Sequence, residues 1–162
     1  MNFTFALKLK MKKIFLAFML CGLVNFAHAQ QIGIVRNAQH RITANLDPIK
    51  QKWEQMLLEQ KIPAILVNFE IRSGMDDSTG KTYYMLLASN RDHSVKVARA
   101  LELKNGYLSF YKGQEEPWGI ATCTGCSNAC NPAVFEGKWV CNGDCPSADR
   151  PCTKSVTTET KN

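Results

Sequence analysis

The sequence predicts an α+β domain in which one amphipathic helix packs on an antiparallel β-meander, followed by a small cysteine-rich segment held by disulfides. Three observations support this prediction. Apolar residues recur at helical spacing after Asp47, strand-like runs joined by turn residues fill positions 64–112, and six cysteines fall within residues 123–152. An export signal precedes all of them, so residues 1–29 are left out of the fold.

The helix is expected to begin at Asp47 and Pro48. Asp47 suits the N-cap position, and Pro48 suits the first helical position, where its missing N–H costs nothing. Pro63 is expected to end the helix region. The apolar residues that share one face recur at i, i+4, i+7 and i+8: Ile49, Trp53, Met56 and Leu57. We interpret this stripe as facing the core and not as a ligand-binding surface.

After the helix the apolar period changes from 3.6 to 2, which is typical of strands. Strands are expected at 64–72, 82–89, 95–103 and 107–112, with a weaker edge strand at 31–36. Asn105 and Gly106 supply the positive φ angles of a tight hairpin turn between the last two runs. Arg99 falls on the apolar side of its strand, which indicates an edge strand or a long side chain whose charge reaches solvent.

The N-terminus has the three parts of a cleavable secretory signal. Lys12 and Lys13 precede an apolar run from Ile14 to Val24, and Ala27-His28-Ala29 gives a small-x-small cleavage site. Met11 is a candidate start. The apolar run is shorter than the roughly 20 residues of a membrane span, and a lipid-modified Cys21 is disfavoured because Leu20 precedes it. We therefore expect cleavage after Ala29 and a periplasmic or extracellular location, with no membrane association afterwards.

The positive charge of the chain lies largely in this signal. Four of the 20 Lys and Arg residues lie in the first 29 positions, which contain no Asp or Glu, so 16 basic and 14 acidic residues remain. Because these charges are scattered, we expect no nucleic-acid partner. The remaining length suits one domain, divided by composition into an α+β part at 30–118, a cysteine-rich segment at 119–152 and a polar tail at 153–162.

The cysteine-rich segment contains few aliphatic residues, so covalent or metal crosslinks must offset its ordering entropy. An even number of cysteines in an exported chain favours three disulfides: Cys123, Cys126, Cys130, Cys141, Cys145 and Cys152. The sequence does not select their pairing, although a hairpin between 119–123 and 138–141 would place Cys123 opposite Cys141. The alternative is a zinc site, because C-x2-C and C-x3-C spacing would suit four thiolate ligands: Cys123, Cys126, Cys141 and Cys145.

No catalytic motif is evident in the sequence. The histidines His40 and His93 belong to no metal-ligand pattern, no nucleophile elbow is present, and Cys123-x-x-Cys126 lacks the strand-to-helix setting of a redox motif. Asp76 and Asp77 lack calcium-loop spacing, so they are expected in a hairpin loop. We therefore expect a non-catalytic module without a cofactor, which binds a protein, glycan or small ligand; the alternative is a zinc-binding protein. The expected contact residues are Tyr111, Trp118 and Trp139.

Overall fold

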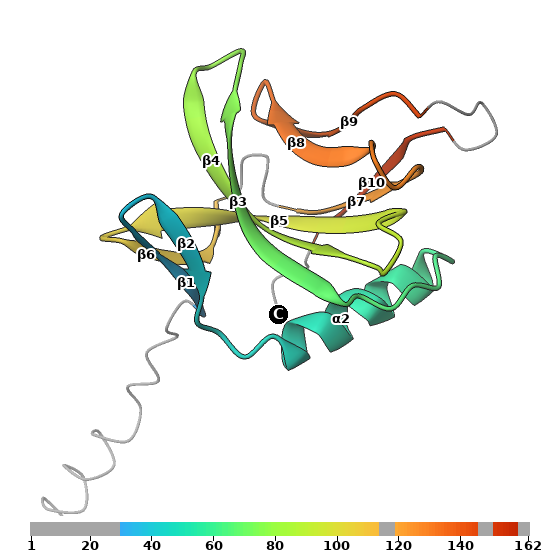
Figure 1. Ribbon diagram of the computed structural model, residues 1–162, viewed down its shortest axis with the longest axis horizontal. Helices are drawn as coiled ribbons and strands as arrows, with labels where there is room; N and C mark the ends of the chain where they lie inside the picture. Colours follow the sequence, from blue (N-terminus) through green and yellow to red (C-terminus); the bar gives the residue numbers. More distant parts are fainter. Residues whose placement is uncertain (1–29, 114–118, 146–150, 159–162) are drawn as a thin grey trace, which may run out of the picture.

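The computed structural model describes residues 30–113, 119–145 and 151–158. Within them the chain forms one short helix and ten strands, arranged as an eight-stranded antiparallel sheet and a separate two-stranded hairpin. Figure 1 shows the helix α2 on one side of the sheet and the hairpin on the other. The structure is thus mostly antiparallel β-sheet, with a second layer that the predicted helix-on-meander arrangement did not include.

The strands follow one another along the chain with short turns between most of them. Their bounds are β1 Gln31–Arg36, β2 Gln39–Ile42, β3 Asn68–Asp76, β4 Lys81–Ser89, β5 Val95–Lys104, β6 Tyr107–Phe110, β7 Ile120–Thr124, β8 Asn131–Phe135, β9 Lys138–Asn142 and β10 Thr153–Thr157. The main sheet runs β10-β7-β5-β6-β1-β2, and β4 pairs with both β3 and β5. Strand β8 pairs only with β9.

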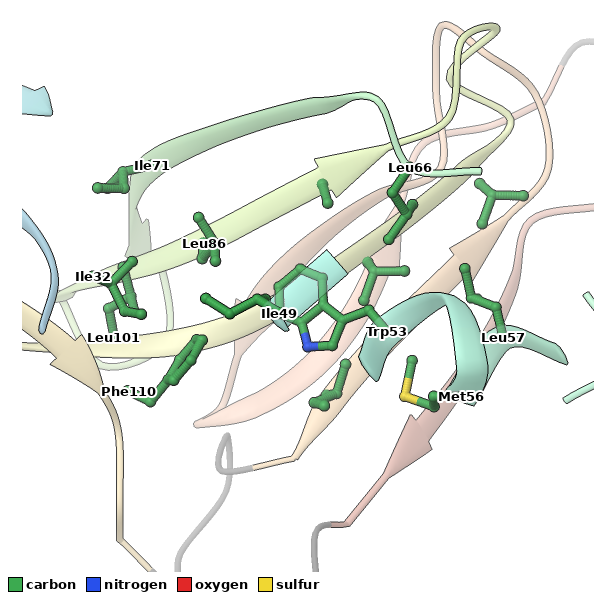
Figure 2. Packing of buried hydrophobic residues seen from close by; sticks show 14 of the residues in the cluster. Ile32, Ile49, Trp53, Met56, Leu57, Leu66, Ile71, Leu86, Leu101 and Phe110 are labelled. Atoms are coloured by element: carbon green, nitrogen blue, oxygen red, sulfur yellow. The ribbon is translucent and has the colours of Figure 1, made fainter. Parts of the chain in front are cut away.

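The helix α2 spans Asp47–Glu59 and buries the predicted face against the sheet. Ile49, Trp53, Met56 and Leu57 are all buried there. They pack against sheet residues that include Leu86, Leu101 and Phe110 (Figure 2). The predicted cap is wrong, because Leu46 occupies the N-cap position and the backbone N–H of Asp47 donates to Asn45 Oδ1 at 3.0 Å. Asn45 therefore satisfies one of the free donors of the first turn.

The opposite face of the sheet is also buried. Side chains alternate between the two faces of a strand, so Ala98 and Ala100 of β5 point away from the helix. They form a second apolar cluster with Ala121 of β7 and with Val134 and Trp139 of the hairpin. Small side chains on the sheet let the hairpin approach closely, and this leaves Trp139 only 1% exposed.

Strand β5 is an interior strand and not the edge strand that Arg99 suggested. It pairs with β4 along one side and with β6 and β7 along the other. The Arg99 guanidinium lies 4.1 Å from the centre of the Phe110 ring, so a cation–π contact accommodates the charge on the apolar face. A charged residue within an apolar run therefore does not identify an edge strand in this sheet.

The Asn105–Gly106 hairpin is confirmed. Both residues have positive φ, and Lys104 lies opposite Tyr107 in the register of β5 and β6. A second hairpin of this kind was missed: Asn37 and Ala38 have φ of 50° and 60° and connect β1 to β2. Because β1 pairs with β2 and also with β6, β1 is not an edge strand.

Two expected segments differ from the structure in their extent. The run expected at 64–72 begins as extended chain and enters β3 only at Asn68, and β3 continues to Asp76. Residues Thr153–Thr157, expected in a polar tail, form β10 and pair with β7. Since β7 also pairs with β5, the cysteine-rich residues and the α+β residues share one sheet. The export signal at 1–29 lies outside the described residues.

Candidate binding groove

A groove lies beside the β8–β9 hairpin, on the face of the sheet that the hairpin partly covers. Its volume is about 480 Å³, within the range of small-ligand sites, about 300–1,000 Å³. It lies between the end of the β3–β4 hairpin, the C-terminal half of β5 and the hairpin β8–β9. Its lining residues are Asp76, Thr79, Lys81, Thr82, Tyr83, Tyr84, Ala100, Leu101, Glu102, Leu103, Tyr111, Val134 and Gly137.

Of the three half-buried tyrosines that line the groove, two pack against the second apolar cluster, whereas Tyr84 packs against the helix-side core. Tyr83 and Tyr111 both contact the second cluster. Tyr83 lies directly opposite Gly74 of β3, and a Cβ at Gly74 would collide with the Tyr83 ring. Glycine at this position lets the ring lie across the neighbouring strand. The backbone N–H of Tyr111 donates to Ala100 O at 3.0 Å, which fixes the chain beside β5.

Two exposed charges of opposite sign accompany these rings. Lys81 lies opposite Asp76, and alternation along β4 places Lys81 on the same face as Tyr83. Glu102 is on the same face of β5 as Ala100. In the described part of the chain neither the Lys81 ammonium nor the Glu102 carboxylate has an ion-pair partner. The groove therefore offers an ammonium, a carboxylate and two phenol rings to a ligand.

Asp76 holds the far wall of the groove in place. Its Oδ1 accepts hydrogen bonds from the Ser78 hydroxyl at 2.6 Å and from the Glu136 N–H at 3.2 Å, and its Oδ2 accepts from the Gly137 N–H at 2.8 Å. Asp76 is only 3% exposed. The Ser78 hydroxyl, followed by the Gly137 N–H, lowers the pKa of Asp76 well below its ordinary range. Asp76 therefore joins the β3–β4 loop to the tip of the β8–β9 hairpin as a structural carboxylate.

The three aromatic residues expected to contact a partner have different environments. Tyr111 lines the groove. Trp139 does not reach a surface: it is buried in the second apolar cluster, and its Nε1–H donates to Gly119 O at 3.1 Å. Trp118 lies outside the described residues. Tyr83 was missed, because Gly74, which lies opposite it, falls beyond the strand expected at 64–72.

All six cysteines of the cysteine-rich segment form disulfides. The pairs are Cys123–Cys141, Cys126–Cys145 and Cys130–Cys152. Cys123 does face Cys141, but the proposed hairpin between their strands is wrong, because β9 pairs with β8 while β7 pairs with β5 and β10. The bridge instead joins the sheet to the hairpin layer. The four residues of the zinc alternative are divided between two disulfides, whereas zinc is held by thiolates.

A serine and a histidine lie together at the β4–β5 turn. Ser89 Oγ and His93 Nδ1 are 2.9 Å apart, but Ser89 is buried. The nearby Asp92 carboxylate accepts hydrogen bonds from the Ser94 N–H and hydroxyl, which lower its pKa. These contacts stabilise the turn and do not align Asp92 with His93.

Comparison with protein-family models, with curated proteins and with solved structures finds no match to this chain. No helix in residues 30–113, 119–145 or 151–158 is long and apolar enough to span a membrane. Three disulfides are typical of proteins that fold in an oxidising compartment.

Proposed function

We propose that this protein is an exported, non-catalytic binding module that uses the groove beside Tyr83 and Tyr111. The observation that carries the proposal is that two half-buried rings line the same groove as the Lys81 ammonium and the Glu102 carboxylate, neither of which has an ion-pair partner among the described residues. Phenol rings supply rigid, amphipathic contact area at a low cost in conformational entropy. The flanking charges orient polar groups of the ligand.

The scaffold around the groove supports binding at fixed geometry. The floor belongs to the central sheet, while the far wall is fixed by the Asp76 hydrogen bonds and the hairpin is tied to the sheet by Cys123–Cys141. A preorganised site loses less entropy when its ligand binds. Export is part of the proposal, and it is supported by the sequence of residues 1–29 and by the three disulfides.

The two rings and the two charges of opposite sign favour a zwitterionic ligand with a flat apolar part, such as a short aromatic peptide. The test is an NMR titration of ¹⁵N-labelled protein starting at Gln30, with tripeptides that contain Phe or Tyr and, separately, with neutral oligosaccharides. We expect the peptides to shift the amide signals of Tyr83, Glu102, Tyr111 and Gly137.

The matched pair of variants is Tyr83→Ala and Tyr107→Ala. Both remove a partly exposed tyrosine from a strand, but Tyr107 is 52% exposed on β6 and does not line the groove. Loss of one aromatic ring from the site is expected to weaken binding about fivefold, corresponding to about 1 kcal/mol for an aromatic contact, whereas Tyr107→Ala should bind as the parent does. Equal binding by both variants, or shifts confined to other surfaces, would refute the groove as the site. Shifts with oligosaccharides alone would assign the groove to glycans and overturn the zwitterionic ligand.

A further inference from the structure

The sulfur atoms of two separate disulfides lie close together. The Sγ atoms of Cys130, Cys141 and Cys152 are all within 4.8 Å of one another. Cys130 and Cys152 are bonded to each other, whereas Cys141 is bonded to Cys123. If the Cys130–Cys152 bond opens, the released sulfur is therefore close enough to attack Cys141 Sγ of the other bridge.

The disulfides adjoin a hollow of about 490 Å³ that one cysteine of each bridge lines. These cysteines are Cys141, Cys145 and Cys152, accompanied by Asn142, Gly143, Asp144 and Pro151. All three are half-buried, while Cys123 and Cys130 are buried. A thiolate entering the hollow therefore meets Cys152 before it can meet Cys130.

The buried end of the Cys123–Cys141 bridge lies between two lysines. Cys123 on β7 is directly opposite Lys96 on β5 and Lys154 on β10, so the three side chains share one face of the sheet. Directly opposed residues have Cβ atoms about 4.5–5.5 Å apart. The Lys154 ammonium donates to Trp139 O at 2.7 Å. A positive charge in the neighbourhood of a cysteine favours its thiolate form and makes it a better leaving group.

The ammonium of Lys96 in particular is held by neutral carbonyl groups. Lys96 is only 5% exposed, and its Nζ donates to the carbonyl oxygens of Ser127 at 3.1 Å and Ala129 at 2.6 Å. Burial, and to a lesser degree the positive charge of Arg72, lower the pKa of Lys96. In the described part of the chain no carboxylate forms an ion pair with it. Since a buried charge is costly without a partner, a Cys123 thiolate would be stabilised here.

We propose that the hollow is a thiol–disulfide exchange site at which an external thiolate converts Cys123–Cys141 into Cys130–Cys141. The external thiolate attacks Cys152 Sγ, forms a mixed disulfide with it and releases Cys130 as a thiolate. Cys130 then attacks Cys141 Sγ, forms the new bond and releases Cys123 as a thiolate on the strand between Lys96 and Lys154. One external thiol is bound as a mixed disulfide, and the total number of disulfide bonds is unchanged. No other oxidant or reductant is required.

The exchange has a structural consequence. The Cys123–Cys141 bond joins β7 of the main sheet to β9 of the hairpin. Its loss removes the direct bond between β7 and β9 and loosens the hairpin, which carries Val134 and Gly137 of the groove wall, while Cys126–Cys145 still joins the segments that follow these two strands. The exchange itself does not depend on the proposed ligand-binding function, because it requires only the sulfur atoms and the lysines.

The test treats oxidised protein starting at Gln30 with a limiting amount of thiol, then quenches with acid, alkylates free thiols and maps the disulfides by mass spectrometry. Glutathione and a thioredoxin-type dithiol enzyme are applied in separate arms. In both arms we expect alkylated Cys123 and a new Cys130–Cys141 bridge. Cys152 should carry glutathione in the first arm and be alkylated in the second, because the second cysteine of a dithiol enzyme displaces Cys152 from the mixed disulfide. The Cys126–Cys145 bridge, which has nearly the same sequence separation, 19 against 18 residues, serves as the internal control and should stay intact.

Either thiol source that yields this species supports the proposal, and the faster one identifies the source. Lys96→Met and Lys154→Met should each slow the release of Cys123, on the order of threefold, because they raise the pKa of the leaving thiol. Lys104→Met, an exposed lysine on the same strand as Lys96, should react as the parent does. Alkylation of Cys130 with Cys123–Cys141 intact, or first opening of Cys126–Cys145, would overturn the proposal.

Discussion

Replacing Trp139 by alanine tests whether the β8–β9 hairpin and the sheet form a second core. Trp139 is 1% exposed and packs in the cluster with Met85, Ala98 and Val134. Truncation of a buried tryptophan to alanine costs about 3–5 kcal/mol of unfolding free energy. The Nε1–H bond to Gly119 O is also lost, which adds about 1 kcal/mol. We therefore expect a destabilisation of about 4–6 kcal/mol, a large part of the stability of a typical domain.

The measurement is urea denaturation of the oxidised protein, followed by far-UV circular dichroism so that the signal does not depend on the deleted indole. Phe135→Ala is the matched control. It removes an aromatic side chain from the same hairpin, but Phe135 is 46% exposed, so we expect a loss of about 1 kcal/mol. Trp139→Phe separates the two contributions, because it keeps most of the apolar volume and removes the N–H donor. A loss below about 1 kcal/mol for Trp139→Ala, equal to that of Phe135→Ala, would refute the packing of the hairpin on the sheet.

Four further predictions concern other parts of the molecule. Gly106→Val should lower the unfolding free energy by about 1 kcal/mol or more, because φ is +82° there and a β-branched residue resists positive φ; an unchanged urea midpoint would contradict the turn assignment. The pKa of Asp76 is lower in the folded state than its ordinary value of about 3.9, so its stabilising contribution is present above about pH 4 and is lost as the pH falls further. Denaturation at pH 6 and pH 2.5 should therefore show a smaller acid-induced loss for Asp76→Asn than for the parent, and an identical loss would exclude Asp76 as the cause. Intact-mass analysis of exported protein should give a chain that starts at Gln30, and retention of Lys12 and Lys13 would show that the signal is not cleaved. Purified mature protein should contain neither free thiols under denaturing, non-reducing conditions nor stoichiometric zinc, whereas four thiols with one bound zinc would restore the metal alternative.

The features predicted correctly from the sequence are those that depend on neighbouring residues. The face of α2 follows from i, i+4 and i+7 spacing, and the hairpin at Asn105 follows from the φ preferences of two adjacent residues. The presence of disulfides follows from an even number of cysteines in a segment too poor in aliphatic residues to fold by burial alone.

What the sequence left open, or indicated wrongly, depends on residues that are distant along the chain. Ala98 and Ala100 alternate with apolar residues as solvent-facing positions would, and only the hairpin carrying Trp139 makes them interior. The partner of β7 on its outer side is β10, about 30 residues later, and residues 153–157 on their own are polar enough to suggest a tail. The tertiary structure decided which cysteines pair and how β3, β4, β5 and the hairpin form the groove. These groups are distant along the chain, and loop closure brings them together. Their separation in the sequence does not indicate which of them come into contact.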